Sequence, residues 1–116
     1  MTLTDTSILI NFLKGKIKYL GDSISIISLM EVRRVIENKR RLEVLKTLED
    51  MFKVYLVDGK VAVEYTELYY RLREKGRLIV DLDLIIASTA KAYDEKLLTR
   101  DKDFLAVKDY VNVEII

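Results

Sequence analysis

Four acidic residues of this chain each follow an apolar, strand-like segment or open a helical pattern. Asp5 comes directly after such a segment, Asp101 comes after another with one residue between, Glu31 stands four residues beyond a third, and Asp83 lies in the first turn of an apolar helix pattern. Carboxylates gathered at one place repel one another strongly unless a cation shares the site. Mg²⁺ and Mn²⁺ prefer oxygen ligands and keep waters for substrate phosphates. We therefore expect these acids to form a divalent-metal site if the fold brings them together.

The composition removes most other chemistry. The chain contains no cysteine and no histidine, which excludes disulfides, thiolate nucleophiles, cysteine-ligated zinc and the commonest general base. Catalysis would then depend on carboxylates, lysine, hydroxyls or a water activated by a metal ion. The formal net charge is +1, so attraction for nucleic acid would have to come from local clusters of positive charge.

The length of the chain and its lack of linker-like segments indicate one domain over residues 1–116. There is no proline, only four glycines, and no serine-rich linker or obvious repeat. No apolar run approaches the roughly 20 residues of a membrane-spanning helix. The opening "MTLTDTSILINFLKGK" has neither a basic leader nor a small-residue cleavage site, so it does not read as a signal peptide. We expect a cytoplasmic protein without membrane partners.

Short segments rich in β-branched residues alternate with helical patterns. The expected strands are residues 2–4, 23–27, 53–57, 96–99 and 112–116. The expected helices are residues 7–15, 29–52, 61–76 and 82–95. This alternation predicts an α/β fold with a parallel sheet and helices on both faces. Ligands of such sheets bind outside the carboxyl ends of the strands, where the strand order reverses, and the four acids are predicted to lie on that rim.

Each acid also has a simpler structural interpretation. Asp81 is best explained as an N-cap that accepts a hydrogen bond from the first turn of its helix. Asp5 could cap the helix that follows it in the same way. Asp101 and Asp103 could shape the turn in "TRDKDF", and Glu31 could owe its place to the helix dipole.

The hydroxyl and basic residues near these acids carry the same two interpretations. Thr99 can be interpreted as a strand-end residue or as a hydroxyl that supports an acid. Ser7 can be interpreted as a helix-start residue or as a hydroxyl near the metal. A basic run is interleaved with glutamates, which favours a solvated, salt-bridged helix face over a phosphate-binding patch. Its members are Arg33, Arg34, Lys39, Arg40, Arg41 and Lys46.

The combination of motifs adds a family resemblance. The opening "LTDTSILINFLKG", the acid in "SLMEV", the helix start "DLDLIIASTA" and "LLTRDKDF" occur in this order over nearly the whole chain. No single one of these motifs is specific, but four in register form a strong signal. The chain resembles a PIN-domain ribonuclease, in particular the VapC-like toxins of toxin-antitoxin pairs.

The resemblance assigns roles to residues. Asp5, Glu31, Asp83 and Asp101 match the family's acidic quartet, and Thr6 or Ser7 and Thr99 match its hydroxyl neighbours. Asp83 takes the helix position, rather than Asp81, because it directly precedes "LIIASTA". Asp5, Asp83 and Asp101 would position one or two metal ions for phosphodiester hydrolysis, and Glu31 would ligate a second ion or orient the water.

The resemblance also implies the fold and the partners. It implies a PIN-like five-stranded parallel sheet, dependence on Mg²⁺ or Mn²⁺, cleavage of single-stranded RNA, a homodimer and an antitoxin protein of a type II toxin-antitoxin system. One departure is the compact stretch between the second and third predicted strands, which affects how the RNA-facing surface is built.

Two other classes compete with this interpretation. A receiver-type signalling domain is also a parallel α/β sheet with an acidic Mg²⁺ pocket, and Asp58 could be its phosphorylated residue. That class needs an acid pair after the first strand, where "LTDTS" holds one acid. The other alternative is a PIN fold that serves RNA processing or acts only as a binding module, with the acids as caps. An intact acidic quartet argues against a purely structural module.

Overall fold

Five parallel strands form the sheet of the computed structural model, which describes residues 1–116. They are β1 (Thr2–Thr4), β2 (Ser23–Ser25), β3 (Lys53–Tyr55), β4 (Lys96–Thr99) and β5 (Val113–Ile115). Their order is β3-β2-β1-β4-β5, and every neighbouring pair is parallel. The chain leaves β1 toward β2 and later returns to the other side of β1 through β4. The strand order therefore reverses between β1 and β4, where ligand sites of such sheets lie.

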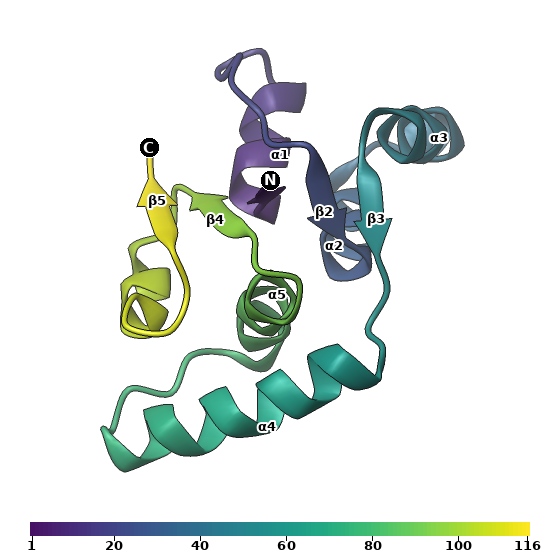
Figure 1. Ribbon diagram of the computed structural model, residues 1–116. Coiled ribbons are helices and arrows are strands. Elements are labelled where there is room, and N and C mark those ends of the chain that lie inside the picture. The colour runs from purple at the N-terminus through teal and green to yellow at the C-terminus, as the bar shows by residue number, and fades with distance from the viewer.

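Helices cover both faces of the sheet, as the sequence predicted (Figure 1). They are α1 (Thr6–Leu13), α2 (Ile26–Val35), α3 (Arg41–Met51), α4 (Gly59–Glu74) and α5 (Asp81–Ala92), with short 3₁₀ helices η1 (Asn38–Arg40) and η2 (Lys102–Val107). One core cluster joins Leu3 and Leu97 to residues of α4, α5 and η2. A second joins Ile24 to residues of α1, α2 and α3. The sheet thus carries an apolar layer on each side.

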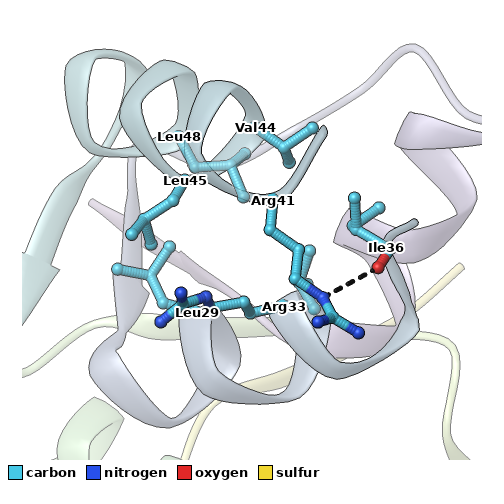
Figure 2. A pocket seen from close by; sticks show the side chains of 8 residues that line it. Leu29, Arg33, Ile36, Arg41, Val44, Leu45 and Leu48 are labelled. Atoms are coloured by element: carbon cyan, nitrogen blue, oxygen red, sulfur yellow. Dashed lines mark hydrogen bonds between the residues drawn. The ribbon is translucent and has the colours of Figure 1, made fainter. Parts of the chain in front are cut away.

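The helix predicted over residues 29–52 is wrong as a single element. The structure has α2, η1 and α3 there, because Ile36 takes an extended conformation at the end of α2 (φ −85°, ψ 139°). Arg41 Nε donates a hydrogen bond to the Ile36 carbonyl oxygen at 3.1 Å and so ties the start of α3 to the end of α2. Figure 2 shows the resulting helical hairpin, with Leu29 and Arg33 on α2 facing Val44, Leu45 and Leu48 on α3.

The predicted strand 23–27 is also too long. It ends at Ser25, whose Oγ accepts a hydrogen bond from the Ile27 backbone N–H at 3.0 Å and caps α2. The chain therefore turns into a helix as soon as it leaves the sheet. This early turn places Glu31 near the rim instead of farther along an extended segment.

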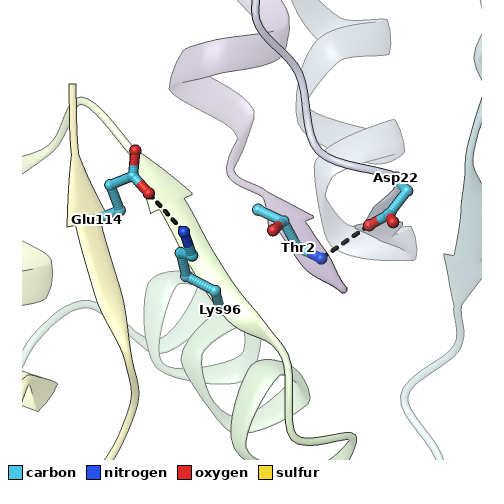
Figure 3. Close-up of polar contacts among 4 residues, drawn as sticks. All are labelled: Thr2, Asp22, Lys96 and Glu114. Atoms are coloured by element: carbon cyan, nitrogen blue, oxygen red, sulfur yellow. Dashed lines mark hydrogen bonds and ion pairs between the residues drawn. The ribbon is translucent and has the colours of Figure 1, made fainter.

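Polar contacts fix the neighbours of β1 and β4 (Figure 3). The Thr2 N–H donates to Asp22 Oδ1 at 2.7 Å, and Lys96 Nζ pairs with Glu114 Oε1 at 2.7 Å across β4 and β5. Gly21 is required beside the first of these contacts, since a Cβ there would lie 2.3 Å from the Thr2 carbonyl oxygen.

None of the helices is both long and apolar enough to cross a membrane.

Candidate acidic site

Asp5 lies at the switch point of the sheet, directly after β1, and is 3% exposed. Its backbone N–H donates to the Leu98 carbonyl oxygen at 2.9 Å, which extends the pairing of β1 with β4. Its Oδ2 accepts hydrogen bonds from Ser7 Oγ at 2.8 Å and from Thr99 Oγ1 at 2.7 Å. Asp5 occupies the N-cap position of α1, but its side chain caps no backbone N–H. The carboxylate is therefore oriented by hydroxyls and not by the helix.

Glu31 reaches the rim from α2 and is half-buried. Its Oε1 accepts a hydrogen bond from Thr6 Oγ1 at 2.7 Å, and Thr6 Oγ1 also lies 2.9 Å from Ser28 Oγ. Sequence reasoning missed Ser28, although it stands three residues before Glu31 and so on the same helix face. The first turn of α1 thus holds the acid that α2 contributes.

Asp101 lies just after β4 and is the N-cap of η2. Its Oδ1 accepts from the Asp103 backbone N–H at 2.9 Å, and its own N–H donates to Thr99 Oγ1 at 2.9 Å. The turn-forming role proposed for Asp101 is confirmed by these bonds. Thr99 also connects Asp101 to Asp5, because its hydroxyl accepts from the first and donates to the second. Ser7 Oγ accepts from the Arg100 N–H at 3.1 Å, which holds the same turn against α1.

Asp83 lies half-buried in the first turn of α5. Burial, followed by the negative charges of Asp5, Asp101, Glu31 and Asp103, raises the pKa of Asp83 to about 6. A carboxyl whose pKa is raised by like charges must lie within their field. The fold therefore brings the four predicted acids into one electrostatic unit, with Asp103 as a weaker contributor.

Asp81 has a different environment, and its predicted role as N-cap is wrong. Val80 occupies the N-cap position of α5, and Asp81 is the first residue of the helix. Its exposed side chain accepts a hydrogen bond from the Tyr65 hydroxyl on α4, with 3.1 Å between the oxygens. The partner comes from another helix, so a local capping rule could not identify it.

The basic run is solvated, as the sequence favoured, but it is not salt-bridged. Arg33, Arg34, Lys39 and Arg40 are exposed and Arg41 is half-buried. All three ion pairs of the structure involve lysines elsewhere: Lys75 with Asp109, Lys91 with Glu64, and Lys96 with Glu114. The positive charge of the run therefore stays available.

The acidic site has the donor chemistry of a hard divalent cation. Asp5, Glu31 and Asp101 each use one carboxylate oxygen for a hydroxyl or amide donor, and the other oxygen makes no hydrogen bond within the protein. None of the four acids is paired with a lysine or arginine. As the side chains stand, no three of them are grouped closely enough to hold an ion. The residue types and their free oxygens fit Mg²⁺ or Mn²⁺, and binding would require side chains to turn toward a common point.

These features define an α/β protein with a carboxylate site at the switch point of a parallel sheet. The family model described as PIN domain matches residues 2–110. The chain belongs to the PIN-domain family.

Individual relatives agree with this membership. Ribonuclease VapC1 of Methanocaldococcus jannaschii is 35% identical over 102 residues, which cover 86% of this chain and 75% of the relative. A chain in the crystal structure of VapBC-5, a member of the VapBC family of toxin-antitoxin systems from Mycobacterium tuberculosis, has a TM-score of 0.76 and 27% identity, with 99% of this chain and 96% of that chain covered. A DNA-bound VapBC structure from Salmonella typhimurium has a TM-score of 0.87 at 21% identity, with 98% and 96% covered. The last of these likenesses shows the fold alone.

Proposed function

We propose that this protein is a metal-dependent endoribonuclease and the toxin of a type II toxin-antitoxin pair. The observation that carries the proposal is the gathering of Asp5, Glu31, Asp101 and Asp103 around Asp83, with no lysine or arginine paired to any of them. Burial, followed by these negative charges, raises the pKa of Asp83. Active sites are where proteins tolerate such repulsion. The 35% identity to a ribonuclease named VapC1 supports RNA as the substrate class.

The chain's own residues would divide the work. Asp5, Asp83 and Asp101, from three different elements, would hold the ion. Glu31 would hold a second ion or orient the attacking water, with Thr6 fixing its carboxylate. Thr99 and Ser7 would keep Asp5 in one rotamer through their bonds to Oδ2. Bound Mg²⁺ or Mn²⁺ would supply positive charge to the phosphodiester and lower the pKa of a bound water. With the pKa of the water lowered in this way, the reaction would not need a histidine as general base.

Two protein partners belong to the proposal. An antitoxin is supported by the structural relative VapBC-5, which is named as a member of the VapBC family of toxin-antitoxin systems. A groove of about 500 Å³ between α1 and the end of α2 offers such a partner an apolar floor with a charged rim. It is lined by Ile10, Leu13, Val35 and Ile36 together with Lys14, Glu37 and Arg40. A homodimer is supported by the exposed apolar residues Leu78, Val80 and Leu82, of which Val80 is 68% exposed.

The test is a cleavage assay with purified protein and a panel of single-stranded and structured RNAs, in Mg²⁺, Mn²⁺ or chelator. We expect cleavage of single-stranded RNA with either ion, none with chelator, and none with Asp5→Asn. Metal-independent cleavage, or cleavage that Asp5→Asn retains, would overturn the assignment of the site. The absence of any cleavage would favour the alternative of a PIN fold that only binds RNA.

The receiver-type alternative disagrees with the topology. In that class β1 lies between β2 and β3, whereas here it lies between β2 and β4. Asp58, the residue that would be phosphorylated, caps α4 through the Val61 N–H at 3.0 Å and accepts a hydrogen bond from the Tyr93 hydroxyl. Asp58 therefore has a structural role away from the acidic site.

A further inference from the structure

An open groove on α2 and the start of α3 is lined almost entirely by arginines. Met30, Arg33, Arg34 and Arg41 surround a space of about 460 Å³, and no acidic residue is among them. We call this surface the arginine groove. Positive side chains repel one another as carboxylates do, so a surface that gathers three of them without an anion is suited to bind one.

The guanidinium groups of the groove are not neutralised within the protein. None of them forms an ion pair. Arg41 is held by two hydrogen bonds, from Nε to the Ile36 carbonyl oxygen and from Nη1 to Asn38 Oδ1, both at 3.1 Å. Figure 2 shows the first of these bonds, with the Arg33 side chain on α2 extending toward Leu29. Arg41 keeps further N–H donors, and its fixed position lowers the entropy that a ligand would remove.

The arginine groove borders the acidic site along α2. Met30 precedes Glu31 in the chain, and Arg34 stands three residues after Glu31. Three residues of a helix rise about 4.5 Å and return to the same face. A ligand bound at the acidic site would therefore need to extend only a short way to reach the arginines.

We propose that the arginine groove binds backbone phosphates of the RNA strand whose scissile phosphate lies at the acidic site. This inference rests on the proposed function and adds to it the surface that holds the RNA backbone beside the acidic site. Arginine suits phosphate because its planar fork donates two parallel hydrogen bonds. The groove has no aromatic lining on which bases could stack, so it should hold RNA without reading its sequence. Its continuity with the acidic site favours a nucleic-acid strand over an acidic protein segment.

The chain offers a matched pair of variants for the test. R33Q/R34Q removes two charges from the groove, and K39Q/R40Q removes two exposed charges from the same basic run outside it. Arg41 is left intact because it ties α2 to α3. Binding of a single-stranded RNA would be measured against salt in the Asp83→Asn background, which prevents cleavage, and cleavage would be measured in the otherwise unchanged protein.

We expect R33Q/R34Q to weaken RNA binding about tenfold or more, and the salt slope to fall by about 0.7 for each phosphate that the variant no longer binds. K39Q/R40Q should change affinity less than about twofold, since exposed charges away from the strand act only through screened long-range attraction. KM for a long RNA should rise while kcat stays, because the groove does not touch the scissile bond. A dinucleotide substrate, too short to reach the groove, should show no difference in KM.

Equal weakening of RNA binding in both variants would overturn the proposal, since it would reflect net charge alone. Unchanged RNA affinity in R33Q/R34Q would also overturn it, as would a variant that loses binding of a poly-glutamate peptide but keeps its RNA binding. If the unchanged protein cleaves no RNA but R33Q/R34Q still selectively weakens RNA binding, the groove stands and only the proposed function fails.

Discussion

Acidic residues lie at both ends of β4, and the two ends differ in how the carboxylates are stabilised. Glu95 precedes the strand, is 5% exposed, and has a hydroxyl for each carboxylate oxygen: Ser23 for Oε1 and Tyr55 for Oε2. Asp83, Asp5, Glu31 and Asp101 gather beyond the other end of the strand, where Asp83 lies in the field of the other three. The pKa of Tyr55 is raised by burial and by its hydrogen bond to Glu95, so its hydroxyl remains a donor.

The contrast separates an acid that stabilises the fold from acids that we propose bind a cation. A buried carboxylate with a donor for each oxygen contributes to stability because its removal leaves those donors unpaired. Carboxylates crowded together reduce stability until a cation relieves the repulsion. The acidic site is therefore expected to respond to metal, and the Glu95 network is not.

The largest expected effect is that of Asp83→Asn on RNA cleavage. Removal of one ligand from the acidic site should lower kcat by about a thousandfold. Mg²⁺ should raise the melting temperature of the unchanged protein by mass action, and this shift should disappear in the variant. Asp81→Asn is the control, since the same substitution two residues away affects an exposed side chain. If Asp83→Asn and Asp81→Asn were both as active as the parent, the assignment of Asp83 to the acidic site would be wrong.

The next effect concerns stability. Glu95→Ala leaves the buried Ser23 and Tyr55 hydroxyls without their acceptor and should lower the free energy of unfolding by about 2–4 kcal/mol. Urea unfolding would measure it. Cleavage per folded molecule should stay unchanged, and Mg²⁺ should stabilise Glu95→Ala as much as the parent. A fall in kcat without a fall in stability would contradict the structural role of Glu95.

A smaller effect is expected from the hydroxyl that joins Asp5 to Asp101. Thr99→Val preserves shape but removes the donor to Asp5 Oδ2, and partners that orient a ligand typically contribute about tenfold or more to activity or metal affinity. Thr99→Ser should restore most of the activity because it restores the hydroxyl. The measurement is cleavage rate against Mg²⁺ concentration. A Thr99→Ser variant as impaired as Thr99→Val would indicate packing as the cause.

The smallest effect is on the pH dependence of stability without metal. The pKa of Asp83 is about 6 in the fold against 3.8 as the ordinary value, so between these values the folded state binds more protons than the unfolded state. Stability from Asp83 therefore falls as pH rises through this window. The slope should stay below the one-proton limit of about 1.4 kcal/mol per pH unit, because Asp83 is partly solvated. The measurement is the free energy of unfolding against pH, and subtracting the curve of Asp83→Asn from that of the parent isolates the contribution of Asp83. A contribution that rises with pH in this window would contradict the crowding of charges.

Much of the architecture could be predicted from local patterns. The bounds of β1 and β4 agree with the sequence because short β-branched or leucine-rich runs end there at polar residues. The strand expected over 23–27 is too long since Ile26 and Ile27 favour a strand by type, while the cap provided by Ser25 starts a helix. The break at Ile36 could not be foreseen because the helical pattern continues through it, and the bond from Arg41 that stabilises the turn joins residues five apart.

The acidic positions could be proposed from sequence, but their partners could not. Asp5, Glu31, Asp83 and Asp101 stand out because each follows a strand or opens a helix. The Asp5–Thr99 contact spans 94 residues, and the Tyr65–Asp81 contact joins two helices. Such contacts depend on how elements pack, and a spacing rule along one helix or strand carries no information about them.

The pairing of β1 with β4 also determines when the acidic site comes into existence during synthesis. Asp5 leaves the ribosome 94 residues before Thr99. Because β4 must insert beside β1 before Asp5 meets its hydroxyl partner, a nascent chain carries the acids without the site. Closing so long a loop is among the slower events of folding. All the residues between Asp5 and Thr99 must therefore have been made before the acidic site can form.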